Sequence, residues 1–480
     1  MASAGAQESE ASGLLGRVRK AWQGEQQYEP LENGTAEDAE EEEEEDDQGH
    51  IQHSSKQSSF SWIEYSIFLL LGVSMLWAWN MFLAAGPYFQ QCFRSNHWIF
   101  DNFQAAEISV STVTNLGSML ILTRLQANAS YPKRIVSSLI INMIIFALLA
   151  LFTETFLDIS ARGYFAFLMI MIFSTSLATG LCQNGIFAYV SGFGEPRYTQ
   201  GIMTGQAVAG VLPCIAQIVS ILSVRPSDNP PNDGPPGDKM PPPRGPPPVH
   251  PGSAFAYFLT ATCISVLTLL AFTYLLARNR HPTSPPPTNP DTRNSNPSDR
   301  KHQIPLRTLS RKLFWPASAV FLTFAITMTF PVYTQIITSV LPPTDQPRIL
   351  QPPSFIPLAF LLWNTGDLFG RMLTAFPSLS LAHRPRLLLL LAILRIAFVG
   401  LYHLCNIRGR GAIVESDFFY LFVVQGLFGL TNGYLGSLTM LAASAYVDPA
   451  EREAAGGFMG LCLVAGLTVG SLASFFVAGA

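Results

Sequence analysis

The chain has 480 residues, of which 49% are hydrophobic and only 13% are charged. Soluble globular proteins carry about 25% charged residues, so this composition excludes an ordinary soluble domain and predicts an all-α integral membrane protein. The net charge of -4 hides two unlike parts, because residues 1–60 hold 15 of the 33 acids and only 4 of the 29 bases. The rest of the chain is therefore basic.

The first 60 residues are polar and acidic, and no short apolar segment follows a basic start. We therefore expect a disordered cytosolic tail and no cleavable signal peptide. Leu14 and Leu15, preceded by an acid, resemble a dileucine sorting signal, and Tyr28 with Leu31 resembles a tyrosine-based one. Together they make sorting adaptors candidate partners and a vacuolar or endolysosomal membrane the address, with the plasma membrane as the alternative.

Eleven apolar segments are long enough to cross about 30 Å of hydrocarbon. Bases gather in the loops after the second and eighth segments and in the stretch 278–313, which predicts a cytosolic N-terminus. An odd number of spans then puts the C-terminus on the other side. The expected spans are 65–85, 105–124, 135–156, 163–188, 200–223, 254–277, 314–340, 355–376, 386–405, 417–440 and 456–478.

Two proline-rich stretches divide the chain. We expect an acidic tail (1–60), a bundle of six helices (61–277), a cytosolic linker (278–313) and a bundle of five helices (314–480). The first bundle contains a proline-rich loop at 225–253 on the non-cytosolic side. Proline-rich linkers are extended and semi-rigid.

Asp367 and Arg371 lie inside the eighth expected span. An ionisable side chain at membrane depth costs about 2.5–3.5 kcal/mol on insertion scales. The i, i+4 spacing places both on one helix face, within reach of each other. Such a pair favours a transport function, in which it contacts a substrate. The alternative is an ion pair that only locks the helix.

Other spans also carry polar groups. Asn80 must find a hydrogen-bond partner or face water, and Trp79 lies too deep for an interfacial belt, so it lines a cavity or packs. Gln183 in the fourth span is a candidate for ligand contact or for helix packing. Arg395 in the ninth span is expected to pair inward.

Acids near or inside the spans are candidates for a titrating group. Glu453 begins the last span, where it either meets Arg134 or complements the helix dipole. Glu64, Glu107 and Glu154 are further candidates, and the sequence selects none of them.

Enzymatic and cofactor-binding motifs are missing from the sequence. It contains no P-loop, no HExxH, no GxSxG and no cofactor fingerprint, so we expect no enzyme, no cofactor and no coupling to ATP. The cysteines lack the spacing of metal ligands, and four of them are expected to be buried in spans. A disulfide between Cys92 and Cys405 stays open. The cysteines are Cys92, Cys182, Cys214, Cys263, Cys405 and Cys462.

Several motifs together resemble the equilibrative nucleoside transporter family. They are Trp79-Asn80, RYTQGIMTGQAVAG (197–210), WNTGDLFGRMLTA (363–375), TNGYLGSLTM (431–440) and PAEREAAGGFMG (449–460). The division into six and five spans is also similar. Two positions depart from the family pattern: Ala78 stands in place of a common proline, and Gly185 stands where mammalian members often have a serine.

The resemblance implies a major-facilitator-like bundle of 11 transmembrane helices, in which two bundles rock around a midplane site. It implies facilitative transport of purine and pyrimidine nucleosides by a monomer in a lipid bilayer, with no nucleic acid as partner. Gly205 and Gly210 match glycines that the family tolerates poorly when substituted. The implied substrate-binding residues are Leu76, Trp79, Asn80, Leu83, Gln183, Phe360, Asn364, Asp367 and Arg371.

Two alternative functions remain open at this point. One is a proton-assisted transporter of nucleosides, or of nucleobases or amines, with the same fold. The other is a membrane receptor that binds without moving its ligand, which flux into liposomes would exclude.

Overall fold

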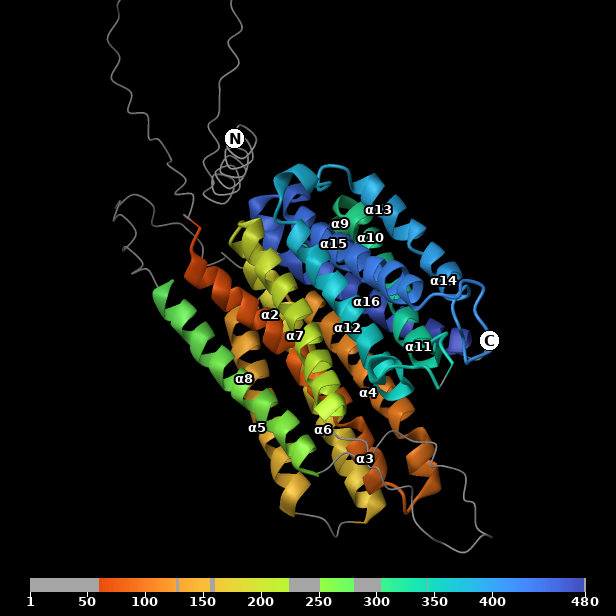
Figure 1. Cartoon of the computed structure of the whole chain (residues 1–480). Coiled ribbons are helices and arrows are strands. Elements are labelled where there is room, and N and C mark those ends of the chain that lie inside the picture. The colour runs from red at the N-terminus through yellow and green to blue at the C-terminus, as the bar shows by residue number, and fades with distance from the viewer. Residues whose placement is uncertain are drawn as a thin grey trace, which may run out of the picture. The chain divides into compact units, whose positions relative to one another are not determined.

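The computed structural model of the chain describes residues 60–126, 129–155, 160–223, 251–279, 304–342 and 344–478. These residues are mostly helical and contain no β-strand (Figure 1). The expected sorting signals at Leu14, Leu15, Tyr28 and Leu31 lie outside the described residues, as does most of the proline-rich loop.

Six long helices cover the first six expected spans. α4 begins eight residues earlier than expected, because the Asn96 side chain caps it by accepting a hydrogen bond from the Ile99 amide at 3.3 Å. With the short helix α3, it makes most of the connection 86–104 between the first two expected spans helical. The helices are α2 (Trp62–Ala84), α3 (Gly86–Cys92), α4 (His97–Arg124), α5 (Tyr131–Thr155), α6 (Ala161–Gly192), α7 (Pro196–Ser223) and α8 (Pro251–Arg278).

The remaining helices are more often interrupted. The seventh expected span is broken near Met328 and the ninth at Arg395, and the tenth begins with a π-helical turn. The expected linker also ends in a helix. The elements are α9 (Leu306–Lys312), α10 (Phe314–Thr327), α11 (Thr329–Ile336), α12 (Pro352–Leu373), α13 (Pro385–Leu394), α14 (Ala397–Tyr402), η3 (Phe419–Gly426), α15 (Leu427–Ala442) and α16 (Arg452–Ala478).

Nine helical segments of the described chain are long and apolar enough to cross a membrane. α4 and α12 occupy the other two expected spans but are not among the nine. The mostly helical membrane architecture is therefore confirmed, and the count of eleven spans stays a prediction.

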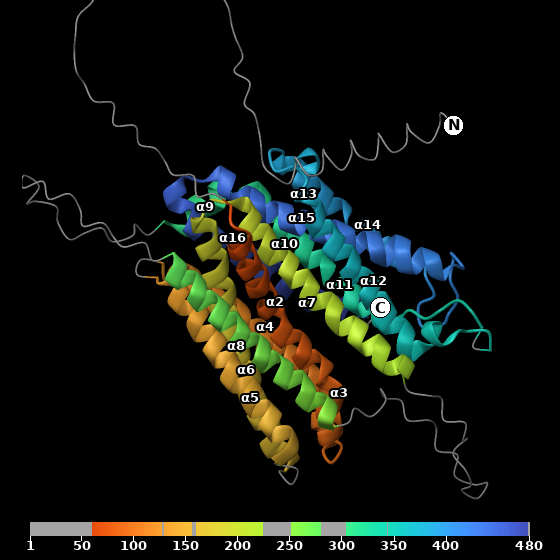
Figure 2. The ribbon, with the colours of Figure 1, turned by 60° about the vertical axis from the view of Figure 1, so that its left-hand side comes forward.

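The helices pack mainly within two sets, α2 to α8 and α10 to α16. In the first set α2 packs on α7 and α8, and in the second α12 packs on α15. The sets meet where α7 lies against α12 and where α16 lies against α4 and α6. Figures 1 and 2 both show α7 beside α12, between the two sets.

At one end of the helices the two sets share a single core. We call this the joined end, and it is the end at which α2 and α16 begin. Its buried cluster includes Phe68 and Ile202 from the first set and Phe324 and Met459 from the second. Apolar burial thus holds the sets together there.

At the opposite end, which we call the split end, each set has its own core. Phe89 and Phe258 belong to a cluster built only from the first set. Phe330 and Phe428 belong to another, built only from the second set. Among the described residues, no shared apolar cluster joins the sets at this end.

Candidate functional site

Glycines allow α7 to approach its neighbours on both sides. A Cβ atom on Gly205 would overlap the carbonyl oxygen of Leu69 in α2, and one on Gly210 would overlap the side chain of Asn364 in α12. Both glycines therefore lie where α7 closely approaches its neighbours, and their role in helix packing stays a prediction.

α12 and α15 are in equally close contact. A Cβ atom on Gly366 would overlap the carbonyl oxygen of Gly426 at the end of η3, and one on Gly370 would overlap the carbonyl oxygen of Leu430 in α15. A Cβ atom on Gly433 would overlap the carbonyl oxygen of Asp367. This approach brings a side chain of α15, Asn432, within hydrogen-bond distance of α12.

The expected ion pair in α12 is present and buried. Arg371 Nε donates to Asp367 Oδ2 at 2.8 Å, and Asn432 Nδ2 donates to Asp367 Oδ1 at 2.6 Å. Both carboxylate oxygens therefore accept hydrogen bonds, which is what a charge removed from water needs. The sequence predicted the pair but not Asn432.

Arg371 also connects the two sets of helices. Its Nη1 donates to the Met203 carbonyl at 2.7 Å and to Gln206 Oε1 at 3.1 Å, both on α7. Gln206 Nε2 in turn donates to the sulfur of Met75 in α2 at 2.8 Å. In this conformation the guanidinium thus closes the contact between α7 and α12.

Through Asn432, the hydrogen-bond network around Asp367 also extends to Arg395. Asn432 Oδ1 accepts from the hydroxyl of Thr327 at 2.6 Å, and Arg395 Nη2 donates to that hydroxyl at 3.1 Å. Arg395 further donates to the Thr323 carbonyl at 2.5 Å and to the Thr431 hydroxyl at 3.2 Å. Arg395 thus points inward in this structure, with neutral oxygens as its hydrogen-bond acceptors.

The expected residues of α2 lie beside this network. Asn80 Nδ2 donates to the Ala209 carbonyl at 2.8 Å, directly before Gly210. Asn80 thus satisfies its amide on α7, as a polar group in a span requires. Leu76 and Trp79 are half-buried. The side chain of Leu83 lies outside the described residues.

An aromatic cluster lies one turn from Asp367. Trp363 stacks on Phe330 of α11 with ring centroids 4.2 Å apart, and Phe360 meets Phe330 edge-on at 5.0 Å. Asn364 Nδ2 donates to the Phe360 carbonyl at 2.9 Å. The Trp363 indole N–H is buried without a partner. Sequence analysis did not identify Trp363 or Phe330 as site residues. For Trp363, the available signal was a tryptophan deep inside an expected span.

Gln183 is buried in α6, and its Oε1 has no partner. Asn115 of α4, which sequence analysis missed, also has an unpartnered buried Oδ1. It lies 3.3 Å from where a Cβ on Gly180 would be, one turn before Gln183. In the described chain, no hydrogen bond joins Gln183 to Asp367 or Arg371.

Arg134 holds the end of α4 at the joined end. Its guanidinium donates to Asn184 Oδ1, to the Leu122 carbonyl at 3.2 Å and to the Leu125 carbonyl at 2.7 Å. Glu453 packs on α6, where a Cβ on Gly192 would lie 3.1 Å from its carboxylate. A direct contact between Arg134 and Glu453 stays a prediction.

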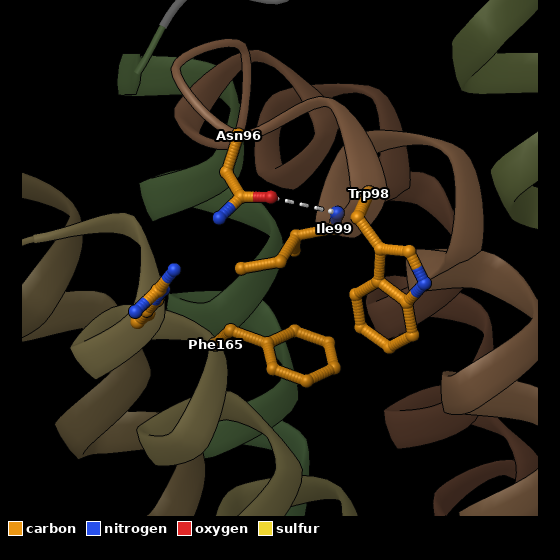
Figure 3. A pocket seen from close by; sticks show the side chains of 5 residues that line it. Asn96, Trp98, Ile99 and Phe165 are labelled. Atoms are coloured by element: carbon orange, nitrogen blue, oxygen red, sulfur yellow. Dashed lines mark hydrogen bonds between the residues drawn. The ribbon is translucent and has the colours of Figure 1, made fainter.

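A hollow of about 340 Å³ lies away from the expected substrate residues, at the split end. Figure 3 shows it between the starts of α4 and α6, where Asn96 caps the helix that carries Trp98 and Ile99. Arg162 and Phe165 of α6 complete the lining. None of the substrate residues expected from the sequence lines this hollow.

The cysteines of the described residues are all free thiols. Cys92 is exposed and Cys405 is buried, so the disulfide left open by the sequence is not formed. The expected burial of the four others holds fully only for Cys182, because Cys263 is exposed and Cys214 and Cys462 are half-buried. No group of potential metal ligands occurs among the described residues.

The helix arrangement resembles solved transporters of the major facilitator superfamily. FucP, a member solved in the outward conformation, aligns with a TM-score of 0.52 at 15% identity, covering 87% of this chain and 95% of that one. The proton:xylose symporter XylE aligns with a TM-score of 0.55 at 9% identity, covering 86% and 87%. The major-facilitator-like fold expected from the sequence is confirmed.

The sequence matches known nucleoside transporters over most of its length. The nucleoside transporter FUN26 of Saccharomyces cerevisiae is 27% identical over 453 residues, covering 86% of this chain and 83% of that protein. Equilibrative nucleoside transporter 1 of Homo sapiens is 26% identical over 474 residues, covering 85% and 95%. The family model described as "Nucleoside transporter" matches residues 169–281 and 276–478. This multi-pass membrane protein therefore belongs to the nucleoside transporter family.

Proposed function

We propose that the protein carries nucleosides across a membrane by facilitative alternating access, driven only by the nucleoside gradient. The observation that supports this most is the buried network around Asp367. Through Arg371 and Gln206 it spans the contact between α7 and α12, where the two sets of helices meet. A hydrogen-bonded contact of this kind can open and close, as alternating access requires.

The chemistry of a nucleoside suits these residues. It is neutral, planar at its base and rich in hydroxyls at its ribose. A carboxylate such as Asp367 accepts hydrogen bonds from hydroxyls, and aromatic rings stack on a base. We assign the ribose to Asp367, Arg371 and Asn364, and the base to Gln183. Walls of the site come from Leu76, Trp79, Asn80, Leu83 and Phe360.

Arg371 is the residue that changes partners in this proposal. In the described conformation it donates to Met203 and Gln206 of α7, and Asp367 is fully hydrogen-bonded. The ribose hydroxyls replace the Gln206 contact when the joined end opens. Substrate binding and release of α7 from α12 are thereby linked.

The proposed orientation of the protein in the membrane follows from the positions of its basic residues. The joined end carries Arg134, Lys312 and Arg384, and basic residues favour the cytosolic face. We therefore place the joined end and the N-terminus in the cytosol and the C-terminus on the other side. A vacuolar or endolysosomal membrane fits the two tail signals, with the plasma membrane as alternative; a monomer is the proposed state.

Uptake of radiolabelled uridine and adenosine by liposomes that contain the purified protein tests this function. With equal pH on both sides, we expect saturable uptake that unlabelled nucleoside competes away. Uptake that needs an acidic outside would replace the proposal with the proton-assisted alternative. Absence of uptake under both conditions would refute nucleoside transport.

A further inference from the structure

Of the four acids that the sequence left as titrating candidates, the structure distinguishes one. Glu64 is half-buried and accepts a hydrogen bond from the Tyr198 hydroxyl at 2.6 Å. Glu453 lies near the start of α16 against α6. The side chain of Glu154 lies outside the described residues. Glu107 is only 2% exposed, and its Oε1 has no hydrogen-bond partner among the described residues.

Glu107 belongs to the packed face of α4. Ile99, Phe103 and Ser111 occur at four-residue intervals around it and are buried as well. Residues at this spacing lie on one side of a helix. The carboxyl group therefore points into the helix packing of the split end and not toward lipid.

Within the described residues, no charged group pairs with Oε1 of this carboxyl. The elements that pack most closely on α4 are α3, α6 and α16. Within the described chain, none of their titratable groups is hydrogen-bonded to Oε1. These groups are Tyr88 and Cys92 of α3, Arg162, Tyr164, Cys182 and Tyr189 of α6, and Arg452, Glu453 and Cys462 of α16.

We propose that Glu107 is a proton-binding site, and that only its protonated form can adopt the conformation in which α4 is packed at the split end. An ionised carboxylate without a partner is strongly disfavoured in such surroundings, whereas the neutral acid is tolerated. An ionised Glu107 has to stay hydrated, and the water bound to it prevents α4 from packing in this way. Because the transport cycle passes through the packed conformation, protonation activates transport. The inference rests on the proposed nucleoside transport.

Protonation here sets the rate of the cycle, and the nucleoside gradient still sets its direction. We therefore expect uptake with equal pH on both sides to be fastest in acid and to fall as the pH rises. Above the titration midpoint, the protonated fraction falls about tenfold per pH unit.

The test compares Glu107→Gln with Glu64→Gln in liposomes at a series of equal pH values. Gln imitates the neutral acid, so Glu107→Gln should transport at a rate that no longer depends on pH. Glu64→Gln should keep the pH profile of the unchanged protein. A Glu107→Gln variant that keeps this profile would overturn the proposal.

A second measurement tests the proton site even if the variant fails to fold or the protein transports no nucleoside. Infrared spectroscopy of the purified, full-length protein detects the carbonyl band of a protonated carboxyl group. We expect a band that is present in acid in the unchanged protein, disappears when the pH is raised, and is displaced in Glu107→Asp. Absence of a band that Glu107→Asp displaces would refute the proton site, whereas absence of uptake with this band present would refute only the transport function.

Discussion

The joined end and the split end are built from the same helices, yet only the joined end shares a core between the two sets. There, Phe68 and Phe324 belong to one buried cluster, whereas at the split end Phe89 and Phe330 belong to two separate ones. Apolar burial is non-directional and proportional to the area removed from water. The difference therefore shows at which end the sets are held together and at which end they are free to separate.

Polar contacts follow the same division. The Arg371 contact with α7 joins the sets next to the shared core. Among the described residues, Oε1 of Glu107, Oδ1 of Asn115 and Nε1 of Trp363 are buried and have no hydrogen-bond partner. A buried unpartnered group is costly, so these groups mark places where a ligand, a proton or another conformation supplies a partner.

The largest effect is expected from Asp367→Asn, which removes the charge at the centre of the network. Buried Arg371 then loses its counter-charge, and the proposed ribose acceptor becomes neutral. We expect uptake per molecule to fall by about tenfold or more, equal to about 1.4 kcal/mol of barrier. Asp345→Asn, at an exposed position, is the control. Normal uptake by Asp367→Asn would exclude direct substrate contact.

The next effect is expected on stability and not on the transport rate: Gly205→Ala tests whether the close backbone contact between α7 and α2 stabilises the joined end. The added Cβ would overlap the Leu69 carbonyl. Forcing a methyl group into packed structure costs about 1–3 kcal/mol, so the thermal midpoint in detergent should fall. Gly117→Ala in α4 is the matched control, because its Cβ would meet nothing within 4 Å. Equal midpoints for the two variants would contradict the close approach of α7 to α2.

The smallest effect is expected from Lys312→Met at the surface of the joined end. Lys312 Nζ lies 2.6 Å from Glu451 Oε2 and 3.0 Å from Asp448 Oδ2. Its hydrogen bond to Glu451 raises the pKa of Lys312, and its hydrogen bond to Asp448 lowers the pKa of that carboxyl. The contribution of this ion pair to the free energy of unfolding is therefore present at neutral pH. It is lost as the pH falls through the lowered pKa of Asp448 or rises through the raised pKa of Lys312.

We expect Lys312→Met to change the thermal midpoint only slightly at low salt, because exposed ion pairs are screened by water and ions. The change should disappear at high salt and at acid pH. Arg311→Met, which removes the neighbouring exposed base, should show no such pH dependence. A large shift for Lys312→Met that persists at high salt would show that this ion pair, and not the shared core, holds the joined end.

Local features of the site were predictable from the sequence. The four-residue spacing of Asp367 and Arg371 predicts a pair on one helix face, and the structure confirms it. The motifs predicted the family, and apolar length predicted most helices. The broken helix at Arg395 was not predictable, because its partners Thr323 and Thr431 come from other helices.

Sequence alone determined that this chain is a helical membrane protein with a charged pair in its eighth expected span, because hydrophobicity and i, i+4 spacing are local properties. Only the tertiary structure decided which partners that pair has, since Gln206 and Asn432 are 165 and 65 residues away in the chain from the groups they contact. It also decided that Glu107 is buried and that its Oε1 has no hydrogen-bond partner among the described residues. Burial is set by the helices that pack around a residue, and pairing by the distances that this packing fixes.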